Sequence, residues 1–306
     1  MIDVAIIGGS FAGLTAALQL GRASRSVVVV DAGAPRNRMS PAAHGVPGWD
    51  GALPSDILSR FRGDATAYPT VSVQIDTVTA AEKTGAGFTL RLASGATLDA
   101  HRVILAHGVK DMLPEIPGAA EAWGKSLIHC PYCHGYEVRH RPLAVLAVHP
   151  MSGHQAQMLR ADWSDEVTLL TGTGAGIVPE DLPGIGVDAR VIQTLQDAGD
   201  SVTVTFEDGS TATFAAIFTA PRVSLDDTPA AQLGCHLGDG PLGPFVEVGA
   251  MGQTSVTGVF AAGDCGGIAH SVTLALGQGA AAGTGCHQSL LFPDFVQPLE
   301  VADCDD

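Results

Sequence analysis

The sequence has little positive charge and no long hydrophobic run. Of its 306 residues only 16 are lysine or arginine, against 32 aspartate or glutamate, so the formal net charge at pH 7 is -16. This balance argues against nucleic acid or an anionic membrane as a partner. No apolar stretch reaches the roughly 18 residues that a membrane span needs, so we expect none. Residues 1–4 enter an apolar run without a basic leader, and we expect a strand there and no signal peptide.

Cysteine is also scarce. Six cysteines in a chain of this length do not resemble a secreted disulfide scaffold, which favours a reducing cytoplasm. Only Cys130 and Cys133 form a C-x-x-C pair. The others are scattered singly, at Cys235, Cys265, Cys286 and Cys304. A zinc site would need a second C-x-x-C or a suitably spaced histidine pair. We therefore predict no metal and favour a redox pair over half of a metal site or a structural disulfide.

Two histidines flank this pair, His129 before Cys130 and His134 after Cys133. A thiolate, not a thiol, attacks a disulfide, and the second cysteine of a C-x-x-C resolves the mixed disulfide. Exchange also needs a group that carries protons near neutral pH, and we assign that role to His134. For His129 we favour a hydrogen-bonded structural histidine over a share in proton transfer or thiolate stabilisation.

The N-terminal segment predicts a dinucleotide-binding β-α-β unit. An apolar run over residues 2–7 leads into Gly8, Gly9, Ser10 and Gly13, a helix over residues 14–20, a strand over 27–30, and Asp31. The glycines allow a tight turn whose backbone N–H groups approach a pyrophosphate, and the acid accepts hydrogen bonds from a ribose. Because Ser10 replaces the middle glycine, the motif reads G-x-S-x-x-G, and its context in the strand and helix strengthens it.

Periodicity and breaker residues predict the remaining elements. We expect a helix over residues 54–67, an antiparallel group over 71–80, 87–93 and 97–105, and a domain boundary near 114–118. A second β-α-β unit is expected over 143–148, 153–161 and 166–170. A hairpin over 202–206 and 211–219 and a long helix over 271–291 rich in Ala and Gly complete the predicted elements.

Three motifs together resemble the low-molecular-weight thioredoxin reductase family of flavoproteins over nearly the whole chain. They are the turn Gly8 to Gly13, the segment Cys130 to Glu137, and Ala262-Gly263-Asp264 before the last helix. The pattern Cys-Pro-Tyr-Cys-His-Gly-Tyr-Glu is most similar to the branch that includes dithiol oxidases of disulfide natural products. The resemblance implies an α/β fold of two Rossmann-like three-layer domains. An FAD domain of residues 1–113 and 242–306 would be interrupted by a degenerate NAD(P)-type domain, residues 114–241, which carries the C-x-x-C.

The resemblance also implies a site and a homodimer. Gly8, Gly9, Ser10 and Gly13 would bind the FAD pyrophosphate, Asp31 the adenosine ribose, and Asp264 the ribityl chain or flavin edge. Cys133 would lie nearer the flavin, and Cys130 would face the substrate. The start of the last helix would direct N–H groups at the flavin, and a loop before residue 50 would line the isoalloxazine. The other implied cofactor-binding residues are Ala32, Arg36, His44, Gly45, Trp49, Gly108, Gly263, Ser271 and Val272.

Two departures from the family concern NADPH. Where its members carry G-x-G-x-x-A, this chain reads Ala147-Val148-His149-Pro150-Met151-Ser152. Side chains replace both turn glycines, and Pro150 removes an N–H donor. After the next strand, residues 170–174 supply no arginine for a 2′-phosphate. We therefore predict that NADPH is not an efficient reductant.

Three functions stay open. The first is an FAD-dependent dithiol oxidase that passes electrons from a small dithiol to dioxygen or another acceptor. The second is a thioredoxin reductase-like enzyme acting on a disulfide or a thioredoxin-like protein, fed by NADPH, reduced ferredoxin or a flavodoxin. The third is a non-catalytic FAD-binding redox sensor. We favour the first, because the cysteine pair is intact and the turn glycines and the arginine that would bind NADPH are missing.

Overall fold

The computed structural model describes residues 1–173, 175, 182–292 and 297–299. The chain forms two compact units, one of Met1–Arg36, Ser55–Lys110 and Ser224–Asp306, and one of Asn37–Pro54 and Asp111–Val223. This division differs from the predicted one in three segments: residues 37–54 and 111–113 belong to the second unit, and residues 224–241 belong to the first. Each unit is built on a parallel sheet with helices, so the α/β class and the two Rossmann-like domains are as predicted.

The first unit contains a sheet with strand order β3-β2-β1-β6-β5-β4, and β19 also pairs with β6. The strands β3, β2, β1, β6 and β19 run parallel, whereas β4 and β5 are antiparallel to their neighbours. The bounds are β1 (Ile2–Ile7), β2 (Val27–Asp31), β3 (Val71–Ile75), β4 (Val78–Thr84), β5 (Gly87–Leu92), β6 (Thr97–Leu105) and β19 (Val259–Ala261).

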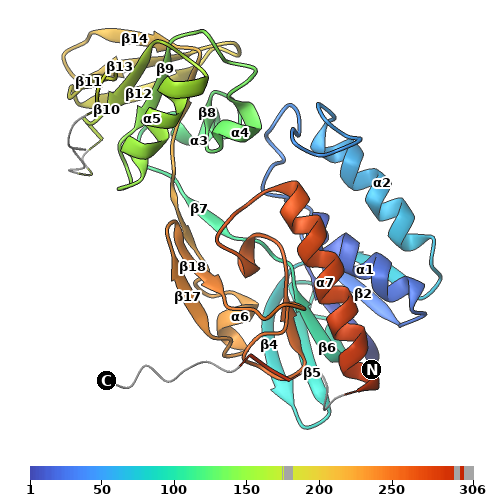
Figure 1. Ribbon diagram of the computed structural model, residues 1–306. Coiled ribbons are helices and arrows are strands. Elements are labelled where there is room, and N and C mark those ends of the chain that lie inside the picture. Colours follow the sequence, from blue (N-terminus) through green and yellow to red (C-terminus); the bar gives the residue numbers. More distant parts are fainter. Residues whose placement is uncertain (174, 176–181, 293–296, 300–306) are drawn as a thin grey trace. The chain divides into compact units, whose positions relative to one another are not determined.

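Helices α1 (Phe11–Arg22) and α7 (Val272–Leu291) lie side by side on this sheet (Figure 1). A Cβ on Gly279 would lie 2.3 Å from the carbonyl oxygen of Ala12, and one on Gly283 would lie 2.9 Å from that of Ala16. The small residues of the last helix therefore serve close packing against another helix. The other helices of this unit are α2 (Pro54–Thr66), whose first residue belongs to the second unit, α6 (Pro229–Gln232) and the 3₁₀ turn η1 (Asp264–Gly266).

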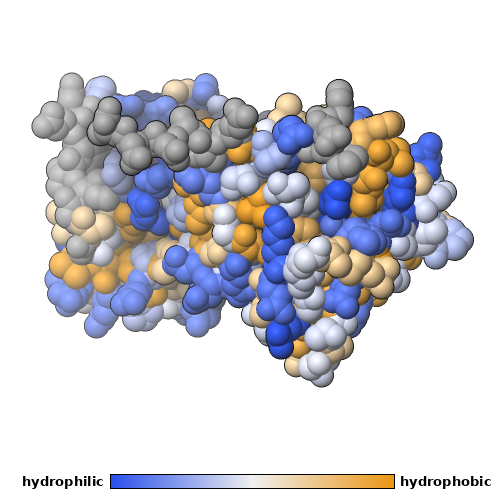
Figure 2. All heavy atoms as spheres, turned by 90° about the horizontal axis from the view of Figure 1, so that it is seen from below, coloured by the Kyte–Doolittle hydropathy of each residue, from blue (hydrophilic) through white to orange (hydrophobic). Residues whose placement is uncertain are grey.

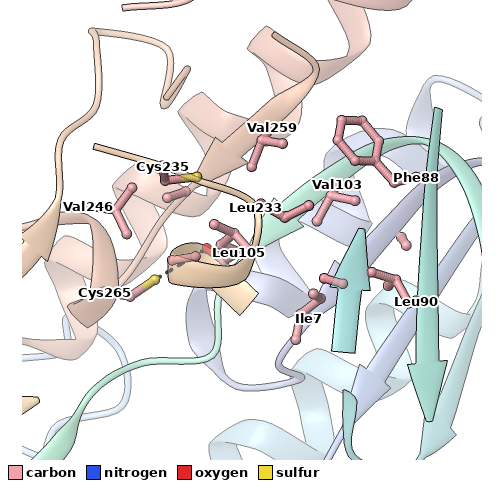
Figure 3. Close-up of a cluster of buried hydrophobic side chains, with 14 of the residues drawn as sticks. Ile7, Phe88, Leu90, Val103, Leu105, Leu233, Cys235, Val246, Val259 and Cys265 are labelled. Atoms are coloured by element: carbon pink, nitrogen blue, oxygen red, sulfur yellow. Dashed lines mark hydrogen bonds between the residues drawn. The ribbon is translucent and has the colours of Figure 1, made fainter. Parts of the chain in front are cut away.

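A buried cluster fills the space between β5, β6 and the hairpin β17 (Leu237–Gly240) and β18 (Gly243–Val246) (Figure 3). Phe88 and Leu90 meet Val103 and Leu105 there, and Val246 comes from the hairpin. Cys235 and Cys265 belong to this cluster as buried, unpaired cysteines. Both act as small hydrophobes, as burial of a free cysteine usually implies.

The second unit has a parallel sheet of order β11-β10-β9-β15-β8, with α5 (Ser152–Asp162) packed on β9 and β10. A three-stranded antiparallel sheet, β12-β13-β14, shares a second buried cluster with it. The bounds are α3 (Ala119–Ala122), β8 (Leu127–Ile128), α4 (Pro131–His134), β9 (Leu143–Leu146), β10 (Val167–Leu170), β11 (Gly186–Asp188), β12 (Ile192–Asp197), β13 (Val202–Phe206), β14 (Thr211–Phe214) and β15 (Ala216–Phe218). In addition, β7 (Lys110–Met112) pairs with β16 (Arg222–Ser224).

Two predicted strands were wrong in their extent. The run 71–80 divides into β3, which is parallel to β2, and β4, because the Asp76 carboxylate accepts the Thr77 N–H and turns the chain. The run 211–219 divides into β14, which alternates between exposed and buried residues, and β15, which is wholly buried. A strand covered on both faces belongs in the parallel sheet, so β15 leaves the hairpin.

Within the described residues no helix is long and apolar enough to cross a membrane. Hydrophilic side chains are spread over the surface in Figure 2, with hydrophobic ones between them. Cys304 and Gly174, which were considered from the sequence, lie outside the described residues.

Candidate redox centre and dinucleotide-binding turn

Cys130 and Cys133 form a disulfide in the second unit, with their Cα atoms 5.2 Å apart. The pair lies on α4, where Cys130 is the N-cap residue and Pro131 occupies the first helical position. Proline is suited to that position, because it has no N–H to leave unpaired. The Cys133 N–H donates to the Cys130 Sγ at 3.1 Å. This donor is placed to stabilise negative charge on the Cys130 sulfur once the disulfide opens.

His134 ends α4 and is half-buried. Its Nε2 lies 3.5 Å from the Ser40 Oγ, and its ring meets that of His44 edge-on, with centroids 6.3 Å apart. Burial lowers the pKa of His134, and positive charge on His44 lowers it further, while the Glu137 carboxylate acts in the opposite direction. The net effect favours the neutral imidazole, which is the form that accepts a proton from a thiol.

His44 stands between two carboxylates. Its Nδ1 is 3.5 Å from Asp50 Oδ1, and its Nε2 is 3.5 Å from Glu137 Oε1. The Gly45 N–H holds Asp50 in place with a 2.8 Å hydrogen bond. Trp49 is on the same loop, where its backbone N–H donates to the Val46 carbonyl oxygen. The loop belongs to the unit that carries the disulfide. The sequence did not indicate that His44 faces His134, because about 90 residues separate them.

His129 is hydrogen-bonded, as predicted. Its Nδ1 lies 3.0 Å from the Thr219 carbonyl oxygen, and its own carbonyl accepts the side-chain amide of Gln155 at 2.7 Å. A carbonyl only accepts, so Nδ1 carries the proton. These contacts anchor the residue before Cys130 to the end of β15 and to α5.

Two aromatic side chains beside the disulfide are largely exposed, Tyr132 at 77% and Tyr136 at 63%. Tyr132 meets Trp163 edge-on at 5.7 Å, and Gly135 leaves room for that contact, because a Cβ there would lie 2.8 Å from the Trp163 Nε1. The Arg139 guanidinium stacks 3.6 Å from the centre of the Tyr136 ring. Sequence reasoning did not select these aromatics, although their place next to the cysteines was a usable signal.

In the first unit, the turn after β1 is closed around its glycines. Gly8 has φ +108°, and a Cβ there would lie 2.2 Å from the Ala106 carbonyl oxygen. A Cβ on Gly9 would lie 2.6 Å from the Asp31 side chain, and one on Gly13 would lie 1.9 Å from the Gly8 carbonyl oxygen. Ser10 is the N-cap of α1 but makes no side-chain cap. The turn thus has the cradle that a pyrophosphate at a helix N-terminus requires.

Asp31 ends β2 and is 8% exposed. One oxygen accepts the Gly33 N–H at 3.0 Å, and the other pairs with the Arg62 guanidinium of α2 at 2.5 Å. Ala32 beside it is exposed. Sequence reasoning missed Arg62, since nothing in the pattern of α2 indicates that this residue reaches the end of β2.

A second polar group gathers around Asp264. Arg36 Nη1 lies 2.9 Å from the Asp264 carboxylate and 2.8 Å from the His270 Nδ1. The Gly263 N–H donates to the Gln278 side chain at 2.9 Å. Arg36 and Asp264 were predicted as site residues, whereas His270 and Gln278 were not. His270 directly precedes the predicted last helix, and Gln278 lies within it.

The start of α7 is capped by its own N-cap residue. The Ser271 side chain accepts the Leu274 N–H at 3.1 Å, and Val272 is the first residue of the helix. Gly108, after β6, has φ +70°, which a glycine tolerates without strain. Of the predicted cofactor residues, the structure thus places His44, Gly45 and Trp49 in the second unit and the others in the first.

The turn after β9 differs from the glycine turn after β1, because side-chain and carbonyl acceptors of the turn itself bind three of its backbone N–H groups. The His149 N–H donates to the Ser152 Oγ at 3.2 Å, and the Met151 N–H donates to the His149 Nδ1 at 3.1 Å. The Ser152 N–H donates to the His149 carbonyl, and the Ser152 hydroxyl to that of Leu146. Pro150 has no N–H. His149 and Ser152 are both buried.

The segment after β10 is also occupied by contacts within the protein. A Cβ on Gly172 would lie 1.9 Å from the carbonyl oxygen of Arg190, so these two backbones touch. The Arg190 guanidinium is bound by the Asp188 carboxylate, donates to the Ser210 hydroxyl at 2.7 Å and lies 3.9 Å from the centre of the Phe206 ring. Hydrogen bonding to Arg190 lowers the pKa of Asp188. The guanidinium of Arg190, whose backbone touches this turn, is therefore already paired.

Comparisons with known proteins agree with this architecture. The family model described as pyridine nucleotide-disulphide oxidoreductase matches residues 2–149. The thioredoxin reductase tcpT of Claviceps purpurea is 35% identical, over 95% of this chain and 95% of that protein. The thioredoxin reductase aclD of Aspergillus oryzae is 32% identical, over 96% and 98%. The structure of an oxidoreductase from Agrobacterium tumefaciens is 40% identical, with a TM-score of 0.88 over 96% of this chain and 99% of that one.

These relatives are similar over nearly their whole length, and they imply a flavin cofactor, for which the glycine turn of the first unit is suited. The disulfide on α4 supplies the second redox group. The chain therefore belongs to the low-molecular-weight thioredoxin reductase-like family of flavoproteins and is a disulfide oxidoreductase.

Proposed function

We propose that this protein is an FAD-dependent dithiol oxidase. A small dithiol is oxidised to its disulfide by the Cys130–Cys133 pair, and dioxygen or another acceptor takes the electrons. NADPH is not an efficient reductant in this proposal. The proposal also includes a cytoplasmic location and a homodimer, the first from the cysteine usage and the second from the family resemblance.

The observation that carries the proposal is the self-capped turn after β9. A pyrophosphate binds such a turn through free backbone N–H groups at a helix N-terminus. Here the N–H groups of His149, Met151 and Ser152 are bound within the turn, and Pro150 has none. A phosphate would have to break these hydrogen bonds and displace the buried His149 ring. The loss would offset much of the binding free energy.

The 2′-phosphate of NADPH meets a second obstacle. Binding it usually requires an arginine whose guanidinium is available for a bidentate contact. The guanidinium of Arg190, whose backbone touches the turn after β10, is held by Asp188 and Ser210. Recruiting it would leave the Asp188 carboxylate without its partner. The two halves of the nucleotide site therefore disfavour NADPH for independent reasons.

The thiol chemistry is balanced by two exchanges. A substrate thiolate attacks Cys130, the Cys130–Cys133 bond breaks, and Cys133 leaves as a thiolate. The second thiol of the substrate then attacks the first substrate sulfur, which is bonded to Cys130 in the mixed disulfide. This step forms the substrate disulfide and releases Cys130 as a thiolate. The Cys133 N–H, 3.1 Å from the Cys130 sulfur, stabilises that charge. The substrate has lost two electrons, and the enzyme pair has gained them.

Protons from the two substrate thiols need an acceptor, and His134 is suited to this role. Its lowered pKa keeps the imidazole neutral near pH 7, so that it can take a proton from an attacking thiol. His44 lies beside it, between the Asp50 and Glu137 carboxylates. A charged His44 disfavours a second charge on His134, which keeps the base ready for each exchange.

In the first unit, Gly8, Gly9, Ser10 and Gly13 would hold the FAD pyrophosphate, and Asp31 would hold the ribose. We assign Arg36, Gly108, Gly263, Asp264, Ser271 and Val272 to the remainder of the cofactor, together with Ala32 next to the end of β2. Bound flavin supplies a two-electron acceptor for the dithiol pair and a donor to dioxygen.

A reductase is the second candidate, because the curated relatives carry the name thioredoxin reductase. The same exchange would then run in reverse, toward a thioredoxin-like protein or a small disulfide. Electrons would come from NADPH, ferredoxin or a flavodoxin.

Anaerobic mixing separates these functions. Purified holoprotein mixed with NADPH should keep its oxidised flavin absorption, whereas a small dithiol such as dithiothreitol should bleach it. In air the same dithiol should then drive dioxygen consumption. Rapid bleaching by NADPH at micromolar concentration would refute the oxidase proposal. Absence of both bleaching and oxygen consumption with any thiol would instead favour a redox sensor.

A further inference from the structure

His107 is a half-buried histidine whose Nε2 is an unused acceptor, and it lies directly beside the glycine turn of the first unit. It follows β6, and its Nδ1 lies 2.9 Å from the Gly108 carbonyl oxygen. Its Nε2 is shielded from solvent and has no hydrogen-bond partner within the described part of the chain. Buried polar atoms in native proteins are nearly always paired, so an unpaired one needs an explanation.

The chemistry of this unpaired atom is fixed by its neighbour. Because a carbonyl oxygen only accepts, the His107 Nδ1 carries the ring proton. Burial lowers the pKa of His107 to about 4, so the ring is neutral in the physiological range. The Nε2 therefore presents a lone pair, and the partner that it lacks is a hydrogen-bond donor.

The position of His107 limits what that donor is. A Cβ built on Gly8 would lie 3.0 Å from the His107 Cα and 2.2 Å from the carbonyl oxygen of Ala106. His107 thus contacts the first glycine of the turn that the proposed function assigns to the FAD pyrophosphate. On either side of a pyrophosphate in FAD, the nearest donors are the hydroxyl groups of the ribityl chain and of the ribose.

We propose that the Nε2 of His107 accepts a hydrogen bond from a sugar hydroxyl of bound FAD, which makes His107 a cofactor-binding residue of this chain. This inference rests on the proposed function, because it requires FAD at the glycine turn. The bond satisfies the buried acceptor only when the dinucleotide is present. His107 then stabilises the holoprotein while it slightly destabilises the apoprotein, where the acceptor stays unpaired.

The test compares His107→Phe, which keeps a planar ring and removes the acceptor, with His107→Gln, which retains an acceptor. His101→Phe, on the exposed face of β6, is the matched control. FAD affinity is measured by flavin fluorescence on titration of apoprotein. His107→Phe should bind FAD about tenfold more weakly than wild type, as expected for one lost hydrogen bond in a buried site. His107→Gln should recover part of the loss, and His101→Phe should bind as wild type does.

Thermal unfolding of the apoproteins separates this role from a structural one. Removing an unpaired buried acceptor should leave the Tm of apo His107→Phe equal to or above that of wild type, while the rise in Tm on adding FAD becomes smaller. A lower apo Tm with an unchanged FAD affinity would overturn the inference and assign His107 to packing. Wild-type affinity in His107→Phe would overturn it as well.

FAD analogues identify the hydroxyl. An analogue with a 2′-deoxyribityl chain and one with a dideoxyribose are each titrated into wild type and His107→Phe. The wild-type protein should bind the analogue that lacks the partner hydroxyl about tenfold more weakly than it binds FAD. The His107→Phe variant should bind that analogue and FAD with equal affinity. Equal losses in both proteins for both analogues would refute the contact. If wild-type protein bound no FAD at all, the proposed function itself would fail, which the wild-type titration reveals separately.

Discussion

Replacing Gly8 by alanine tests whether the glycine turn of the first unit is built for a dinucleotide. The new Cβ would stand 2.2 Å from the carbonyl oxygen of Ala106, whereas ordinary contacts begin at 3.4 Å. The backbone must therefore open by about 1 Å at a point where it is tied on both sides. The Gly8 N–H donates to Val30, and the Ala106 N–H donates to Ile7, each at 2.8 Å.

The magnitude follows from two costs. The φ of +108° is unfavourable for a residue with a side chain, by about 1–3 kcal/mol. Overpacking a rigid contact typically adds about 1–3 kcal/mol. The free energy of unfolding of the apoprotein should thus fall by roughly 2–6 kcal/mol, within a total of about 5–15 kcal/mol for typical proteins. The displaced N–H groups should also weaken FAD binding by at least about tenfold.

Urea denaturation of the apoprotein and flavin fluorescence titration measure the two effects. Gly277→Ala is the matched control, because Gly277 lies in α7 with nothing within 4 Å of its Cβ position. This helical substitution should change stability by less than about 1 kcal/mol, in the stabilising direction, and leave FAD affinity unaltered. If Gly8→Ala matched wild type in both stability and FAD affinity, the close approach of Gly8 to Ala106 and its role at the cofactor would both be wrong.

Other substitutions address the redox centre and His107. Cys130→Ser and Cys133→Ser should each lower dithiol-dependent oxygen consumption more than a hundredfold, on the order expected for a lost nucleophile, with the flavin still bound in the absorption spectrum. His134→Gln should slow turnover about 10²–10⁴-fold, and full activity would remove it as the base. His44→Gln should raise the pKa of His134, because positive charge on His44 lowers it, so the acid limb of the pH–rate profile should move to higher pH. Burial lowers the pKa of His107 to about 4 from 6.5, so its contribution to stability is complete above pH 6.5 and declines by about 3 kcal/mol as the pH falls to 4. The His107→Phe apoprotein should lack that part of the acid destabilisation in urea titrations at these two pH values.

Short-range patterns predicted much of the fold. The run of β1, the glycine turn and α1 is specified by residues that are neighbours in sequence, since turn geometry and hydrophobic periodicity are local properties. The cysteine pair is equally local, because a spacing of two residues brings both sulfurs together on one helical turn. The long helix α7 was predicted to within a residue at its start, where Ser271 caps the N–H of Leu274.

The strand assignments show where local patterns fail. Residues 211–219 read as one strand, yet only the packing of β15 between β8 and β9 divides them. The two faces of β15 are covered by segments distant in the chain, and periodicity over a few residues does not reveal what covers a strand. The same limit hid the parallel pairing of β3 with β2.

The sequence by itself determined the chemistry: a dithiol pair with a neighbouring histidine, a dinucleotide turn, and a second turn without glycines. Tertiary structure alone decided the partners of these groups. It brought His44 against His134 and Arg62 to Asp31. Such contacts depend on which strand ends meet at one edge of a sheet, a long-range property that residue order does not encode locally. The capacity of the C-x-x-C pair for thiol-disulfide exchange follows from its own residues. The side chains that surround its proton acceptor are brought together only by the fold.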